Sequence, residues 1–204
     1  MHTYRMKKFM PVLLLAALPL FAATPPKKVP PKTKAKALLT IADNATFCDG
    51  TYALCIKAPC DPKANSNNEV QCACVMETGW NMGPNSCADR KKNLTSTYSN
   101  LFNPNSATVT CPSKINWAWC YGAPCEKVTK DGKEVANCRC PVTFNTAVIL
   151  VDAAKCQTTD ACSPTRMMSA ASPKESSFAN NHYYDWMTKH GHESSPPSPA
   201  CPTQ

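Results

Sequence analysis

Cysteine is the residue type with the widest chemical options in this chain, and its spacing favours disulfide bonds over metal binding or catalysis. The sequence holds 14 cysteines, and most of them fall into two sets of six with the same order. Each set contains a Cys-x-x-Ala-Pro-Cys segment and then a Cys-x-Cys segment. No Cys-x-x-Cys occurs, although zinc fingers and thioredoxin-like redox sites usually need that spacing. The two sets are, in chain order, Cys48, Cys55, Cys60, Cys72, Cys74, Cys87 and Cys111, Cys120, Cys125, Cys138, Cys140, Cys156.

The histidines are the next candidates for chemistry, and three of them gather near the C-terminus. His182 and His190 lie two turns apart on one face of an expected helix, too far apart to bind one ion together without a bend. His190 and His192 flank a glycine and are weak candidates for metal binding through an irregular turn. No ligand motif with a known spacing is present, so we expect no metal ion and no cofactor.

The usual signatures of catalysis are absent from the sequence. It contains no Gly-x-Ser-x-Gly, no His-Glu-x-x-His and no glycine-rich phosphate loop. We therefore expect no catalytic residue and no enzyme, and a binding or interaction protein is the favoured interpretation. A histidine-metal hydrolase and a protease inhibitor are less favoured alternatives.

Three tryptophans are candidate binding residues. Trp117 and Trp119 alternate, so their side chains share one face if the segment is a strand. Exposed, they would stack on a sugar ring or anchor a contact with a protein of the envelope or extracellular space. Buried, they are core residues, which is the interpretation we favour. Trp80 has the same two interpretations.

The N-terminus is typical of a bacterial export signal over residues 1–22. A basic stretch around Lys7 and Lys8 precedes an apolar run, which ends in small residues. Export explains the cysteines, because disulfides persist in the periplasm or outside the cell. We expect one of these two locations.

A linker rich in proline and lysine is expected over residues 23–37. Prolines favour an extended chain there, and like charges repel one another. The formal net charge is +8, but basic and acidic residues balance from residue 37 onward, so nucleic acid is not an expected partner. The linker is a solvated spacer or a tether to an anionic surface, and the tether would make the protein a structural envelope component. The tether lysines are Lys27, Lys28, Lys32, Lys34 and Lys36.

The sequence predicts a small disulfide-rich fold of β-hairpins and loops, with two tandem six-cysteine repeats and a C-terminal α-helix. The first repeat is expected over residues 38–89. Residues 90–156 are expected to hold a connecting helix and the second repeat. The helix is predicted from the spacing of Leu94, Tyr98, Leu101 and Phe102. Residues 157–204 are expected to hold the C-terminal helix and a proline-rich tail.

Local signals place one hairpin and one helix. Asp131-Gly132 favours a type I′ turn, which puts Cys125 opposite Cys138 within disulfide range. Cys60 and Cys72 occupy the same places around a turn near residues 65–68. Geometry alone therefore allows the pairs Cys60–Cys72 and Cys125–Cys138.

The C-terminal helix is predicted from its caps and its periodicity. Ser172, Pro173 and Glu175 form its start, and Gly191 ends it. Aromatic residues and histidines recur every four positions and form one broad face. We expect this face to pack on the cysteine-rich units, because those units have little core of their own.

The order of cysteines resembles that of epidermal growth factor-like modules. The first set has a Cys-x-Cys at Cys72 and Cys74, followed by Gly79-Trp80 and Gly83 before the last cysteine. The second set lacks the glycine, and neither set has the acidic segment of calcium-binding members, so no calcium site is expected. The resemblance implies the pairs Cys48–Cys60, Cys55–Cys72, Cys74–Cys87, Cys111–Cys125, Cys120–Cys138 and Cys140–Cys156.

Two cysteines remain outside the sets, Cys162 and Cys201, and a mutual bond is the simplest completion. Exchange with a second chain is the alternative. A bridge that closes a short loop contributes about 3 kcal/mol, as much as the thin core of one unit. We therefore expect reduction to unfold both units.

Overall fold

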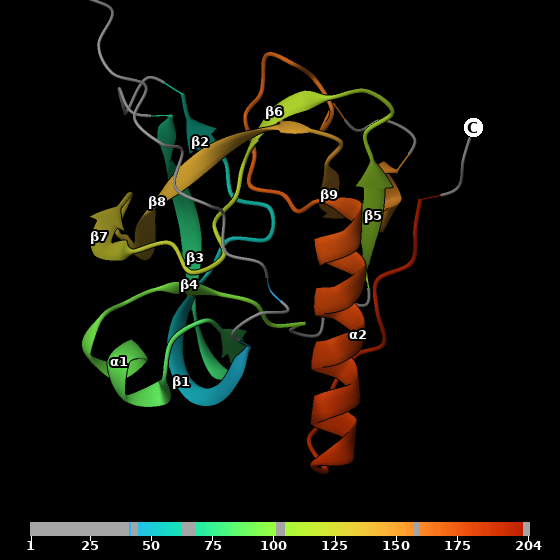
Figure 1. Cartoon of the computed structure of the whole chain (residues 1–204). Helices are drawn as coiled ribbons and strands as arrows, with labels where there is room; N and C mark the ends of the chain where they lie inside the picture. Colours follow the sequence, from blue (N-terminus) through green and yellow to red (C-terminus); the bar gives the residue numbers. More distant parts are fainter. Residues whose placement is uncertain (1–40, 42–44, 63–67, 101–104, 157–159, 202–204) are drawn as a thin grey trace, which may run out of the picture. The chain divides into compact units, whose positions relative to one another are not determined.

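The computed structural model describes residues 41, 45–62, 68–100, 105–156 and 160–201, which belong to one compact unit, Ala37–Gln204. The expected export signal, the linker and its five lysines lie outside the described residues, as does most of the turn expected near residues 65–68. No described helix is long and apolar enough to cross a membrane. The fold is strand-rich and disulfide-rich with one long C-terminal helix, as the sequence predicts (Figure 1).

Two long strands, β3 (Glu69–Gly83) and β8 (Lys133–Asn145), run antiparallel at the centre of a seven-stranded sheet. In the sheet order, β1 (Thr46–Leu54) and β4 (Ser96–Thr97) continue beyond β3, and β6 (Ile115–Ala118) continues beyond β8. The register places Cys72 opposite Cys138. Strands from the two predicted units therefore belong to one sheet and bring their cysteines together.

Two shorter strands add to the central pair. Strand β2 (Cys60–Asp61) pairs with β3, and β7 (Cys125–Lys130) pairs with β8. The β7–β8 turn has positive φ at Asp131 and Gly132, and Cys125 lies opposite Cys138. The hairpin predicted from Asp-Gly is confirmed with its register.

A separate two-stranded sheet joins β5 (Ser106–Thr110) to β9 (Val148–Asp152), which the short 3₁₀ helix η1 (Ala153–Lys155) follows. The apolar run that forms β9 suits a strand that buries alternate side chains. Ile149 and Val151 are both buried in the core.

The C-terminal helix α2 (Pro173–Lys189) begins and ends as predicted. The Ser172 hydroxyl accepts a hydrogen bond from the Glu175 N–H, and Gly191 has a φ of 72° beyond the last turn. The Glu175 carboxylate accepts from the Ile41 N–H at 3.0 Å and so ties the helix to an earlier segment.

The connecting helix predicted from Leu94 and Tyr98 is wrong over the described residues 94–100. A short helix, α1 (Cys87–Lys92), comes earlier, and β4 occupies part of the predicted span. The Tyr98 N–H donates to the Met82 carbonyl and the Met82 N–H donates to the Tyr98 carbonyl, at 2.8 and 2.7 Å. Pairing with the sheet thus overrides a helical spacing that was only local. Leu101 lies outside the described residues.

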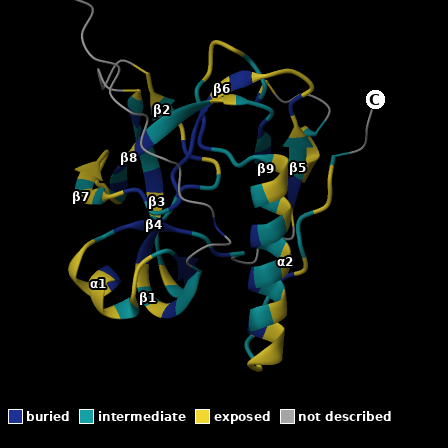
Figure 2. Cartoon of the chain, in the orientation of Figure 1, coloured by how far each residue is buried: buried dark blue, intermediate teal, exposed yellow. Residues whose placement is uncertain are grey.

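Buried residues form two clusters that differ in composition. Figure 2 marks the buried residues along the fold in dark blue. The cluster that we call the aromatic core unites α2, β6 and the β5–β9 sheet, and it contains Trp117, Trp119, Tyr183 and Met187. The cluster that we call the sulfur core lies around β3 and β8 and contains Val70 and the residues Ala53, Cys55, Ala58, Cys72, Cys74, Ala118, Cys120, Ala123, Ala136, Cys138 and Cys140.

Candidate functional site

The four inner disulfides follow from strand geometry. Cys60 is opposite Cys72 and Cys125 is opposite Cys138 in the sheet register, and both pairs are bonded with a Cα–Cα distance of 4.0 Å. The pairs allowed by hairpin geometry are therefore confirmed. The cysteines that flank these pairs in the sequence bond to each other in both sets, as Cys55–Cys74 and Cys120–Cys140.

The outer disulfides join segments that lie far apart in the sequence. Cys48 bonds to Cys87, Cys111 to Cys162 and Cys156 to Cys201. The pairing implied by the resemblance is wrong throughout, because Cys60 and Cys125 bond to the strand residues directly opposite them and the remaining cysteines have other partners. The overturned pairs are Cys48–Cys60, Cys55–Cys72, Cys74–Cys87, Cys111–Cys125, Cys120–Cys138 and Cys140–Cys156, together with the completion Cys162–Cys201.

All 14 cysteines are bonded, and none is free. Seven disulfides indicate an oxidising, exported environment. The cysteine groups whose sulfurs lie close enough to share an ion, such as Cys55, Cys74 and Cys120, consist of disulfide sulfurs. They offer no thiolate, which is the form of cysteine that binds metals and attacks substrates.

Two of the three candidate tryptophans are core residues. Trp117 and Trp119 are 2% and 5% exposed and meet edge to face with ring centroids 6.0 Å apart. The Trp117 indole N–H donates to Asn145 Oδ1 at 2.8 Å, which satisfies its one polar group inside the core. A binding role for Trp117 and Trp119 is therefore wrong, and the core interpretation is confirmed. Trp80 is only half-buried.

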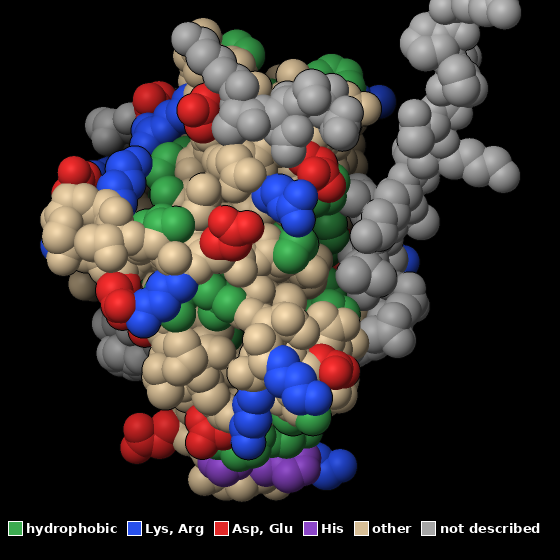
Figure 3. All heavy atoms as spheres, turned by 90° about the vertical axis from the view of Figure 1, so that its left-hand side faces the viewer, with side chains coloured by type: hydrophobic (Ala, Val, Ile, Leu, Met, Phe, Trp, Pro, Cys, Tyr) green, Lys and Arg blue, Asp and Glu red, His purple; other side chains and the backbone are tan. Residues whose placement is uncertain are grey.

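The rings around the C-terminal end of α2 form a group that we call the aromatic–histidine surface, composed of Phe47, Trp80, His182, Trp186, His190 and His192. At the lower end of the molecule in Figure 3, histidine side chains lie next to hydrophobic side chains and to a lysine or arginine. His190 is exposed, and the other members are half-buried.

Helix periodicity and one turn bring these rings together. The rings of Phe47 and His190 each stack on Trp186 with centroids 4.1 Å away. The positive φ of Gly191 turns the chain, and the ring of His192 comes within 4.6 Å of the ring of Trp80. This packing confirms that the aromatic face of α2 covers the first cysteine-rich unit.

The structure does not bring the histidines together as metal ligands. His182 stacks on Phe178 at 5.0 Å, and His190 Nδ1 lies 2.7 Å from the Trp186 carbonyl oxygen. Within the described ranges, every cluster of three side chains close enough to share an ion consists of cysteines. Each of the three histidine rings instead contacts an aromatic ring.

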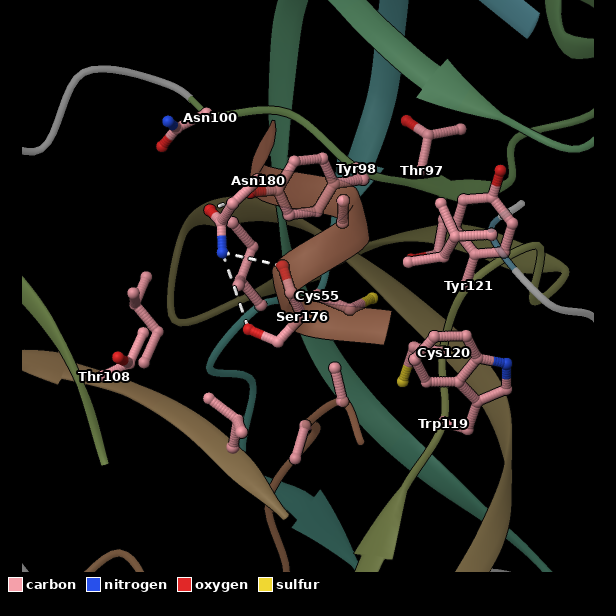
Figure 4. A pocket seen from close by; sticks show the side chains of 18 of the residues that line it. Cys55, Thr97, Tyr98, Asn100, Thr108, Trp119, Cys120, Tyr121, Ser176 and Asn180 are labelled. Atoms are coloured by element: carbon pink, nitrogen blue, oxygen red, sulfur yellow. Dashed lines mark hydrogen bonds between the residues drawn. The ribbon is translucent and has the colours of Figure 1, made fainter. Parts of the chain in front are cut away.

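A small cavity lies between α2 and the segment that contains β4 (Figure 4). Its volume is about 80 Å³, and its walls include Tyr98, Trp119 and Asn180. The Tyr98 hydroxyl donates to Asn180 Oδ1 at 2.5 Å, and the Asn180 amide donates to the Ser176 carbonyl at 2.8 Å. Both polar groups are thus engaged within the protein.

Two of the residues that line this cavity, Thr97 and Tyr121, have buried hydroxyls with no hydrogen-bond partner in the structure. Burial raises the pKa of Tyr121 well above its usual value, so the hydroxyl stays protonated. A water molecule needs about 10–15 Å³, whereas pockets for small molecules occupy about 300–1,000 Å³. The cavity therefore suits ordered water, and the aromatic–histidine surface is the better candidate for contact with a partner.

The sequence does not single out two residues that matter here, Phe47 and Arg90. The contact of Phe47 with Trp186 joins residues too far apart in the chain for periodicity to detect. Arg90 is buried in α1, although its sequence neighbours are charged. No motif signals either contact.

Comparison with known proteins gives no match: no family model, no curated protein and no solved structure is similar to this chain.

Proposed function

We propose that this chain is an exported binding protein, held in shape by disulfides, that acts without catalysis and contacts a partner protein through the aromatic–histidine surface. The observation that carries the proposal is the group of half-buried rings around Trp186, with His190 exposed. Tryptophan and other aromatic residues dominate the binding energy of protein interfaces. We place the protein in the periplasm or outside the cell.

The stacking within this surface favours a protein partner over a glycan. A sugar ring binds to an open, flat aromatic face, but Phe47 and His190 already stack on Trp186. Ring edges and the outer side of His190 remain for contact. Charged residues rim the surface, since Asp185 and Lys189 are exposed, and a polar rim around aromatic residues is the usual anatomy of an interface.

Rigidity supports a binding role. Cys48–Cys87 bonds the residue next to Phe47, and the Tyr183 hydroxyl donates to the Trp80 carbonyl at 2.7 Å. Side chains that are ordered before binding lose little entropy when a partner arrives. The surface is therefore prepared for contact without rearrangement.

Site-specific photo-crosslinking in the producing cells tests the proposal. A photoreactive amino acid replaces Lys189 at the rim, and the matched control replaces Lys127 on β7, which is also exposed. We expect one discrete adduct with a protein from position 189, its loss when His190→Ala is added, and no such adduct from position 127. Equal adduct patterns from both positions would refute the proposed surface.

A second titration distinguishes the glycan outcome. Soluble peptidoglycan fragments are added while tryptophan emission is recorded, with Trp80→Ala as the comparison. We expect no saturable change. A saturable quench that Trp80→Ala abolishes would replace the protein partner with a glycan.

The structural-component alternative depends on the lysines of residues 23–37, which lie outside the described residues. It remains a prediction, and so do the two tandem repeats and the N-terminal export signal.

A further inference from the structure

A buried arginine with no acidic partner marks a second site, remote in sequence from the aromatic rings of α2. Arg90 is 8% exposed and donates to Asn81 Oδ1 and to the Thr46 carbonyl, both at 2.6 Å. It also contacts Cys48 Sγ. All three partners are neutral. No carboxylate forms an ion pair with Arg90 within the described part of the chain.

This arrangement leaves a positive charge uncompensated. Its Nε–H is buried and has no hydrogen-bond partner. Burial of a charge is costly unless an opposite charge or several hydrogen bonds offset the lost hydration. An arginine keeps its proton under these conditions, so the charge persists. The structure therefore holds a cation that an incoming anion would stabilise.

A pocket of about 380 Å³ is lined in part by Arg90. Two further cations from α1, Lys91 and Lys92, line it with exposed side chains, whereas Asp49 is its one acidic lining residue. The lining therefore carries a net charge of +2. Thr51 adds an exposed hydroxyl that can hydrogen-bond to an oxygen ligand, whereas the Asn81 amide already donates to the Cys48 and Gly79 carbonyls.

Close packing fixes the arginine in place. A Cβ at position 83 would lie 2.7 Å from Arg90 Nη1 and 2.5 Å from Thr97 Cγ2, so only a glycine leaves room for the guanidinium. The disulfide Cys48–Cys87 joins β1 to the start of α1 at the same place. A charged group held in this way does not need to reorganise when a ligand binds.

We propose that this pocket binds an oxyanion group, of the class of sulfate, phosphate or carboxylate, through Arg90, Lys91 and Lys92. Guanidinium and ammonium groups form strong, charge-assisted hydrogen bonds with such oxygens. The pocket is larger than one oxyanion, so the group belongs to a larger molecule such as an acidic sugar. This site is independent of the aromatic–histidine surface.

The test measures binding by NMR at constant ionic strength, with chloride as the balancing anion. Inorganic sulfate, inorganic phosphate and glucose 6-phosphate are titrated separately into the full chain, and the Arg90 Nε–H signal reports on the site. We expect saturable shifts of this signal, with glucose 6-phosphate binding more tightly than inorganic phosphate. Equal affinities for inorganic phosphate and glucose 6-phosphate would refute the proposal that the ligand is larger than one oxyanion. The absence of a saturable shift would refute the proposed binding site.

Variants at the exposed positions Lys91, Lys92 and Asp49 test the proposal and leave the buried Arg90 unchanged. Lys91→Gln with Lys92→Gln should weaken phosphate binding about tenfold, which corresponds to about 1.4 kcal/mol. Asp49→Asn should tighten it severalfold, because it removes the opposing charge. The control pair, Lys155→Gln with Lys174→Gln, should change it less than twofold. Unchanged affinity in the Lys91 and Lys92 variant would overturn the proposed site, because its two exposed cations would then make no contact with the anion.

Discussion

The aromatic core and the sulfur core lie in the same compact unit but are filled with different side chains. The aromatic core packs large residues such as Trp117, Ile149 and Tyr183 from three parts of the chain. The sulfur core contains almost only cysteine and alanine, and its one larger buried residue is Val70. Alanine buries little apolar area, so hydrophobic transfer alone contributes much less there.

This difference shows which region of the fold depends most on disulfides for its stability. Four of them lie in or beside the sulfur core, where strands β3 and β8 meet. The expectation of a thin core is correct for that region and wrong for the aromatic core, to which α2 contributes Tyr183 and Met187. The sulfur core thus depends on its disulfides, whereas the aromatic core combines apolar burial with the bonds Cys111–Cys162 and Cys156–Cys201.

The largest effect is expected from Trp117→Ala. Removing this buried indole leaves a cavity and an unpaired Asn145 side chain, which should lower the free energy of unfolding by about 3–5 kcal/mol. Urea denaturation with the disulfides intact measures it. The control Phe144→Ala removes a ring that is 64% exposed and should change stability by less than about 0.5 kcal/mol. Similar losses in both variants would mean that the aromatic core is not a packed core.

The next largest effect belongs to the sulfur core. Replacing Cys55 and Cys74 together by alanine removes one buried disulfide with a sequence separation of 19 residues and should cost about 2–5 kcal/mol. The same denaturation experiment measures this cost under oxidising conditions. In a reducing buffer the double substitution should hardly change the free energy of unfolding, because the bond is already broken. Trp117→Ala should still destabilise any structure that remains. A cost that is the same in both buffers would contradict the assignment of stability to the bond.

A smaller effect is expected from Tyr183→Phe, which tests the contact between α2 and β3. The Tyr183 hydroxyl donates to the Trp80 carbonyl at 2.7 Å, and its loss should cost about 0.5–1.5 kcal/mol. Thermal unfolding followed by circular dichroism measures the change. The neighbouring Tyr184→Phe serves as control and should have a smaller effect, since Tyr184 is less buried.

The smallest effect is expected at the surface of the β7–β8 hairpin. Lys127 and Glu134 form an ion pair at 2.6 Å with both side chains more than half exposed. A double-mutant cycle with alanine at both positions should give a coupling of about 0.2–1 kcal/mol that 1 M salt removes. A coupling above this range that survives salt would show that the hairpin is stabilised by charge as well as by its disulfide.

The sequence predicted those elements whose signals are local. The Asp131-Gly132 turn fixes its own register, and Ser172 and Gly191 fix the ends of α2, because each acts within a few residues. The Asp-Gly turn allowed Cys125–Cys138, and the matching positions in the first set allowed Cys60–Cys72, both as alternatives to the pairs implied by the resemblance.

Contacts between distant segments were not predictable in this way. Cys111 bonds to Cys162 across 51 positions, and Phe47 meets Trp186, but no spacing rule joins residues so far apart. The helix expected around Tyr98 does not form, because Tyr98 pairs through its backbone with Met82, a contact that local spacing does not predict. No local pattern predicts the burial of Arg90 either, because this burial depends on Asn81 and Gly83 in strand β3.

Hydrogen exchange of the fully reduced and alkylated protein, read by mass spectrometry, tests the central claim most directly. The claim is that the sulfur core keeps its structure only through its disulfides. We predict that the amides of β3 and β8, protected in the oxidised protein, exchange as fast as in an unfolded chain after reduction. Retained protection of these two strands without disulfides would contradict the account.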